Sequence, residues 1–197
     1  MSITKDFYSV FVLTNEHKPV KKLDECVFAL SHGEEYKIKI VNHHINLRAN
    51  ASISIDGKNI GYFRINSNSS IIIERPAKQE RRLTFYKRGT KEAIKGGLEC
   101  DNAEQGILRV TIEQEKEPEV SMLRAACLPR RIFCEESDCA EESYCAGGTA
   151  LGRASSQRFS NASNMITKDE VTVVRALMVV DNGMDNCVDV VDDIMSL

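Results

Sequence analysis

The fold class follows most directly from residues 51–65, which read ASISIDGKNIGYFRI. Apolar residues alternate with serines up to Ile55, the pair Asp56-Gly57 follows, and a second apolar-rich run ends at Ile65. An Asp-Gly pair between two such runs is typical of a two-residue β-hairpin turn, because both central residues of a type I′ turn need a positive φ. Residues 35–41, EYKIKIV, alternate in the same way. These stretches predict antiparallel strands.

Short strands of this kind recur along the chain, separated by clusters of turn residues. No long segment with helical periodicity lies between them, which argues against a parallel sheet with crossover helices. The continuous run Ile71-Ile72-Ile73 predicts a strand that is buried on both faces or that lies where two sheets cross. We expect an all-β fold, an antiparallel β-sandwich of the jelly-roll-like kind, with strands at residues 7–13, 26–30, 35–41, 51–56, 59–65, 69–74, 82–87, 106–114 and 170–180.

The chain of 197 residues is long enough for one domain with a proper core. Residues 114–168 are acidic, cysteine-containing and then rich in Gly, Ser and Asn, so we expect a long loop inserted between strands. The apolar strand after it should return to the core, which makes residues 1–180 a single domain. Residues 181–197 form an acidic C-terminal tail without Lys or Arg, and Val188, Val191 and Ile194 have a spacing that predicts a short helix.

Composition excludes some classes of protein. The net charge of -3 provides no overall positive field that would hold nucleic acid non-specifically. No apolar run approaches the roughly 20 residues needed to span a bilayer, so we expect no membrane span. Lys5 and Asp6 lie where a signal peptide would be apolar, which predicts a protein that stays inside the cell. The 7 cysteines, an odd number, then favour reduced thiols.

Four cysteines gather in the expected loop, and four thiolates could close a tetrahedral zinc site. Structural zinc sites usually use tight cysteine pairs, and only Cys134 and Cys139 have a suitable spacing. We therefore expect no cofactor and reduced cysteines in a contact-forming loop. A zinc site and a disulfide across an oligomer contact are the alternatives. The candidate zinc ligands are Cys127, Cys134, Cys139 and Cys145.

Residues 147–152, GGTALG, have the composition of a phosphate-binding loop, whose backbone amides can hold oxyanions. The Lys and the Ser or Thr that should follow the last glycine are replaced by Arg153 and Ala154. The segment is therefore expected to be a structural turn.

Basic residues concentrate in residues 75–95, where only Glu80 and Glu92 oppose them. Aromatic residues are interleaved with the cations, and strand alternation would place Arg82, Thr84 and Tyr86 on one face, as in a surface that tracks a nucleic-acid backbone and stacks on bases. The alternative is a solvated edge strand whose charges block aggregation, which an acidic partner such as the chain's own tail would also suit. The candidate nucleic-acid contacts are Arg75, Arg81, Arg82, Lys87 and Arg88.

No catalytic set can be assembled from the sequence. His43 and His44 stand at a strand end, where neighbouring side chains point to opposite faces and cannot share a role. No Ser/His/acid set, Cys/His set or carboxylate pair stands in a recognisable context. We expect that the protein is not an enzyme.

Several motifs lie in order along the chain. They are YKIKI from Tyr36, SIDGK from Ser54, GYFRI from Gly61, IERP from Ile73, RLTFY from Arg82, and GGTALG from Gly147 followed by SQRF from Ser156. With these motifs, residues 7–180 resemble a family of poorly characterised β-sandwich proteins encoded by large DNA viruses of amoebae and algae, with some cellular homologues.

The resemblance implies a non-enzymatic component of the virus particle, located in the virion and inside the host cell, in the cytoplasm or nucleus. It carries over no catalytic residue. We therefore expect a structural or interaction protein that self-associates into a homo-oligomer or presents its loops to other viral or host proteins. A nucleic-acid-binding module that uses residues 75–95 is the alternative.

Overall fold

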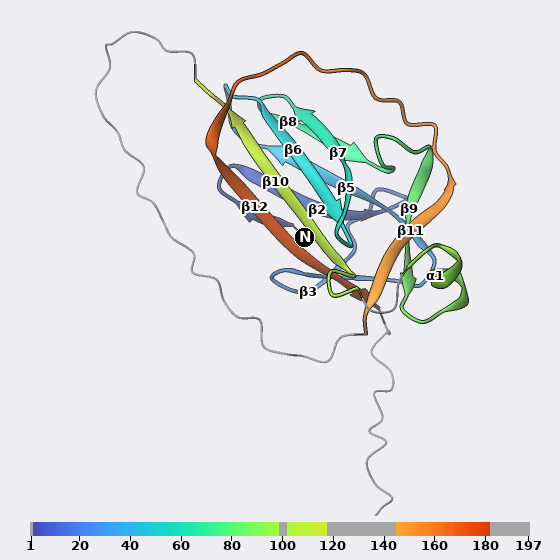
Figure 1. Ribbon diagram of the computed structural model, residues 1–197. Coiled ribbons are helices and arrows are strands. Elements are labelled where there is room, and N and C mark those ends of the chain that lie inside the picture. Colours follow the sequence, from blue (N-terminus) through green and yellow to red (C-terminus); the bar gives the residue numbers. More distant parts are fainter. Residues whose placement is uncertain (1, 99–101, 118–144, 182–197) are drawn as a thin grey trace, which may run out of the picture.

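The computed structural model describes residues 2–98, 102–117 and 145–181, which form a mostly β structure of two sheets (Figure 1). The first sheet contains β1 (Ile3–Lys5), β2 (Tyr8–Thr14), β5 (Glu34–Asn42), β8 (Ser69–Ile73), β9 (Arg81–Lys87) and β11 (Gly147–Ala154). The second contains β3 (Lys21–Asp24), β4 (Val27–Leu30), β6 (Ala49–Ile55), β7 (Lys58–Ile65), β10 (Ile107–Glu115) and β12 (Thr167–Val180). The expected all-β fold class is confirmed.

Strand pairing is antiparallel with one exception among the described strands. The order in the first sheet is β1-β2-β5-β9-β11. β8 also pairs with β5, along the same edge of β5 that pairs with β9. The order in the second sheet is β3-β4-β12-β10-β6-β7, where β4 and β12 run parallel, from Val27 beside Leu177 to Leu30 beside Val180. The expected purely antiparallel pairing is therefore wrong at this one position.

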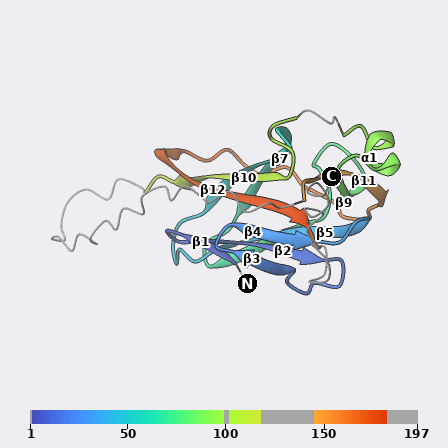
Figure 2. The same cartoon turned by 90° about the horizontal axis from the view of Figure 1, so that it is seen from below.

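The core lies between the sheets, in a sandwich-like arrangement that Figure 2 shows with β10 and β12 in one layer and β2 and β5 in the other. Alternate residues of each strand point into one apolar cluster, as the period of two in a β-strand requires. Tyr36, Ile38 and Ile40 of β5 join Ile53 of β6 and Val110 of β10 in this cluster. The alternation noted in residues 35–65 thus marks the buried faces.

The β6–β7 hairpin has the turn that the Asp-Gly pair predicts. Asp56 and Gly57 have φ of 52° and 75°, and Ile55 pairs directly with Lys58. The Asp56 carboxylate is buried and accepts hydrogen bonds from the backbone N–H groups of Gly106 and Thr149, both at 2.6 Å. Burial raises the pKa of this carboxyl. The turn therefore joins the second sheet to β11 of the first.

The structural turn expected at residues 147–152 is wrong, because these residues belong to β11, which pairs with β9 along its length. The expected insertion at 114–168 therefore includes a strand of the first sheet. Glycine is required here by close packing: a Cβ at Gly147 would lie 2.1 Å from Cζ of Phe85. Glycines weaken the strand signal in a sequence, which explains why the pattern did not reveal β11. The short strands β1 and β3 and the helix α1 (Lys91–Lys95) were not expected either.

The run Ile71-Ile72-Ile73 is not buried on both faces. It lies in β8, which pairs only with β5 among the described strands. Ile73 is buried, whereas Ile71 and Ile72 are half-buried. The strand expected at residues 69–74 agrees within one residue with β8, which ends at Ile73.

The only helix in the described part of the chain is α1, whose five residues are far too few to cross a membrane. The helix expected in the acidic tail falls on residues 182–197, outside the described residues.

Candidate functional site

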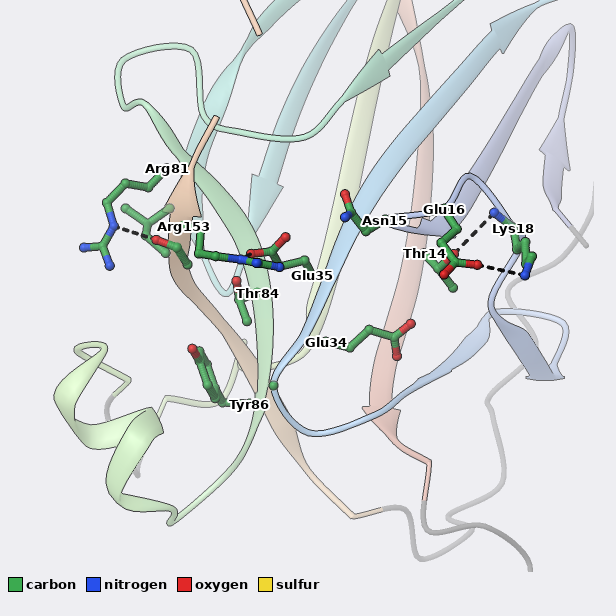
Figure 3. A pocket seen from close by; sticks show the side chains of 13 residues that line it. Thr14, Asn15, Glu16, Lys18, Glu34, Glu35, Arg81, Thr84, Tyr86 and Arg153 are labelled. Carbon is green, nitrogen blue, oxygen red and sulfur yellow. Dashed lines mark hydrogen bonds and ion pairs between the residues drawn. The ribbon is translucent and has the colours of Figure 1, made fainter. Parts of the chain in front are cut away.

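A groove of about 850 Å³ opens on the outer face of the first sheet (Figure 3). One wall is the turn after β2, and the other is formed by β9 and β11. Glu34 and Glu35, at the start of β5, lie between the walls. The groove is lined by Thr14, Asn15, Glu16, Lys18, Gly33, Glu34, Glu35, Arg81, Thr84, Tyr86, Leu151, Gly152 and Arg153.

The centre of the groove is the carboxylate of Glu35, which is bound by two guanidinium groups. Arg153 Nε donates to Glu35 Oε1 at 2.8 Å, and Arg82 Nη1 donates to Glu35 Oε2 at 3.1 Å. The hydrogen bond from Arg153, followed by that from Arg82, lowers the pKa of Glu35, although burial opposes the shift. Arg82 Nη1 also donates to Asn15 Oδ1 at 3.3 Å. This network connects β5, β9, β11 and the turn after β2.

The two walls of the groove differ in charge: the β9–β11 side carries exposed arginines, and the other side carries Glu16 paired with Lys18. On the β9–β11 side, Arg153 is 81% exposed although it pairs with Glu35, and Arg81 is exposed while its Nε donates to the Gly152 carbonyl at 2.8 Å. On the other side, Glu16 is 73% exposed and pairs with Lys18 at 2.8 Å. Glu34 accepts a hydrogen bond from the backbone N–H of Ser31. Both signs are thus open to a partner.

The floor of the groove is close-packed. Thr84 is buried, and within the described residues its Oγ1 has no hydrogen-bond partner. A Cβ at Gly152 would lie 2.0 Å from this oxygen, so only glycine allows β11 to pass over Thr84. Tyr86, next along the same face, packs edge-on against His32 at 5.6 Å between ring centroids. The groove is therefore part of the sheet and not a gap between loops.

Arg75, one of the candidate nucleic-acid contacts, is a buried structural residue. Its guanidinium donates to the carbonyl oxygens of Pro76 at 3.0 Å, Gln79 at 2.8 Å and Gln157 at 2.8 Å. It also lies 4.5 Å from the ring centroid of Phe159. Its Nε and Nη1 donors are used inside the protein and the residue is buried, so Arg75 is not available to a phosphate backbone.

The segment that Arg75 holds, residues 155–163, follows β11 and lies against the edge of β8. The Gln157 side chain accepts from the N–H of Glu74 at 3.1 Å and donates to the carbonyl of Ile72 at 2.7 Å. The Phe159 ring packs on Phe63 at 5.2 Å between centroids. These contacts fasten the segment between β11 and β12 to both sheets.

The other candidate nucleic-acid contacts lie on β9 or just after it. The prediction that Arg82, Thr84 and Tyr86 share a face is consistent with Leu83 and Phe85 being fully buried on the opposite one. Arg82 is half-buried in its pair with Glu35, whereas Arg81, Lys87 and Arg88 are exposed. Nucleic-acid binding by the exposed members stays a prediction.

Of the candidate zinc ligands, Cys127, Cys134 and Cys139 lie outside the described residues. Cys145 is described, and it packs against the main core cluster. No group of three metal-ligating side chains occurs in residues 2–98, 102–117 and 145–181. His43 and His44 have different neighbours: His43 hydrogen-bonds Ser9 at 2.8 Å, and His44 packs edge-on against Phe7.

The sequence did not point to Glu35 or Arg153. They are 118 positions apart, and only the pairing of β11 with β9 brings them together. Neither residue stands in a motif. Comparison with known proteins adds nothing to this assignment, because no protein-family model, curated protein or solved structure matches the chain.

Proposed function

We propose that the protein is a non-enzymatic structural protein that self-associates through the groove on its first sheet. The observation that carries the proposal is that exposed charged side chains of both signs line the groove. Arg81 and Arg153 lie on one side, Glu16 lies on the other beside Lys18, and Glu34 lies between them (Figure 3).

Such a surface is complementary to itself. A two-fold axis brings the same patch of two copies together, so that each residue meets a different residue of the second copy. Rotation about an axis through the groove can place the arginine wall of one copy against Glu16 of the other. Each copy then gains the same set of charge-assisted hydrogen bonds, which are stronger than neutral ones.

The openness of the groove also favours a macromolecular partner. Sites for small molecules bury most of the surface of their ligand in a concave, mainly apolar pocket. Here the groove is open, and charged side chains as exposed as Arg153 and Glu16 line it. A protein surface can cover such side chains, with a polar rim around a smaller apolar centre.

The proposal includes the particle-associated setting that the resemblance implies. Many copies at high local concentration populate a contact that is weak between two free chains. In this setting the wide groove, and not a deep pocket, is the functional part of the sandwich-like scaffold.

Sedimentation velocity over a range of concentrations tests the proposal. We expect wild-type protein to form dimers or larger oligomers as its concentration rises, and Arg153→Glu to shift the equilibrium to monomer. Lys78→Glu is the matched control, because Lys78 is exposed but lies outside the groove. A wild-type protein that stays monomeric at the highest concentration reached, or an Arg153→Glu variant that associates like wild type, contradicts the proposal.

A further inference from the structure

We propose that the acidic segment, residues 182–197, docks on a basic face of its own chain formed by Lys87, Lys91 and Lys95. The basic face lies at the end of β9 and on α1, next to the groove but separate from it. The inference does not depend on the proposed function, because its residues do not line the groove.

The basic face is exposed and carries a strong charge for its size. Lys87, Lys91 and Lys95 are all exposed, and Glu92 is the one acidic residue on α1. Ile94, beside them on α1, is 59% exposed. The face therefore offers three exposed lysines and an exposed apolar side chain.

The acidic segment has matching chemistry. It contains Asp185, Asp189, Asp192 and Asp193 and no Lys or Arg. Valine and isoleucine residues are interleaved with these aspartates. Carboxylates and apolar side chains in alternation can pair with the lysines and cover Ile94 at the same time.

The described chain ends at Asp181, which pairs with Lys21 at 4.0 Å, and the residues just before it lie near this face. Ala146 forms an isolated bridge with Val179 near the end of β12, and its carbonyl accepts from the N–H of Arg88 at 3.1 Å. Lys91 is three residues beyond Arg88, so their Cα atoms lie within about 11 Å of each other. The end of β12 and the start of α1 are therefore neighbours.

The length of the segment is sufficient. An extended chain advances about 3.3 Å per residue, so Asp185 can reach about 13 Å from Asp181. The remaining residues allow the later aspartates to follow α1. Exposed ion pairs are individually weak, but a tether of this length keeps the local concentration of carboxylates in the millimolar range, which favours docking.

Zero-length carbodiimide crosslinking of the full chain tests the inference, because it joins carboxylates to amines that are in contact. We expect crosslinks from the four aspartates to Lys87, Lys91 and Lys95 within one chain. A mixture of ¹⁴N- and ¹⁵N-labelled protein separates these from crosslinks between chains. The yield should fall severalfold between about 0.01 M and about 1 M salt, because the Debye length falls from about 30 Å to about 3 Å.

A second measurement uses the reactivity of the lysines. In a variant with all four aspartates replaced by asparagine, acetylation of Lys91 and Lys95 should become severalfold faster. The exposed Lys5 and Lys78 are the matched controls, and their rates should not change. Unchanged rates at the basic face overturn the inference.

Two other results would also overturn the inference. The aspartates could crosslink only to Lys21 and Lys22, which lie near the end of β12 in the second sheet. Alternatively, a single-stranded oligonucleotide could protect Lys87, Lys91 and Lys95 equally well in wild type and in the asparagine variant, which would assign the basic face to nucleic acid. Either result leaves the groove and its proposed function untouched.

Discussion

Replacing Arg75 is the sharpest test of the assignment of this residue to the protein interior. Arg75→Ala removes the donors to the carbonyl oxygens of Pro76, Gln79 and Gln157, at 3.0, 2.8 and 2.8 Å. A hydrogen bond from a charged group contributes about 1.5 to 3 kcal/mol, and water can replace part of each loss. We expect the free energy of unfolding to fall by about 3 to 5 kcal/mol, a large share of the total for a single domain.

Urea denaturation at neutral pH measures this loss. Arg75→Lys keeps the charge but not the planar fork of donors, so it should fall between wild type and Arg75→Ala. Lys78→Ala, at an exposed position in the same loop, should change stability by less than about 0.5 kcal/mol. Amide exchange around Gln157 should accelerate in Arg75→Ala, because this segment loses its main anchor.

Two results would contradict this structural role of Arg75. If Arg75→Ala costs less than about 1 kcal/mol, its hydrogen bonds do not hold residues 155–163 in place. If the same variant instead weakens binding to a single-stranded oligonucleotide without a loss of stability, the original prediction of a nucleic-acid contact is right.

Three further predictions concern packing and charge. Gly152→Ala should destabilise the protein by about 1 to 3 kcal/mol through contact with Oγ1 of Thr84. In urea denaturation, adding Thr84→Ala should recover part of this loss, whereas purely additive losses would contradict the contact. Arg48 lowers the pKa of Glu115 to about 2, so the pair stabilises the protein fully above the ordinary pKa of 4.5 and loses its effect as the pH falls toward 2. The Tm difference between wild type and Glu115→Gln should therefore shrink over this range, and a constant difference would contradict the pair. Burial raises the pKa of Asp56, so ionisation of this carboxyl costs stability as the pH rises above the ordinary pKa of 3.8. The stability advantage of wild type over Asp56→Asn should therefore decline as the pH rises, and the midpoints of urea denaturation measure this decline.

The fold class could be predicted because its signal is local. The apolar residues of β5 and β6 other than Val41 face the core at a period of two, and the Asp56-Gly57 turn has a backbone that few residue pairs adopt. The strand ends at Asn42 and Ile65 lie within one residue of those expected. Local rules were sufficient for these elements.

β11 could not be predicted from the same rules. Gly147 and Gly152 are required by the ring of Phe85 and the hydroxyl of Thr84, which lie more than 60 residues earlier in the chain. A glycine-rich strand whose residues are determined by packing against a neighbouring strand does not show the hydrophobic alternation of a β-strand in its sequence. The segment therefore had the composition of a loop.

The candidate site was hidden for the same reason. Arg82 belonged to a basic run, which suggested an anionic partner, but its charge is balanced by Glu35 on the neighbouring strand. Arg75 belonged to the same run and is buried. A count of charges along the chain does not show which cations already have a carboxylate or carbonyl partner in the fold.

The central claim is that the groove joins two copies through opposite charges, and a charge-swap experiment in native mass spectrometry tests it most directly. Arg153→Glu and Glu16→Lys alter exposed side chains on opposite walls. We predict that each variant alone is monomeric and that an equimolar mixture forms the heterodimer. In the heterodimer both contacts between position 153 of one copy and position 16 of the other join opposite charges, whereas in each homodimer both contacts join like charges. A mixture that stays monomeric while wild type associates, or variants that each associate like wild type, would contradict the claim.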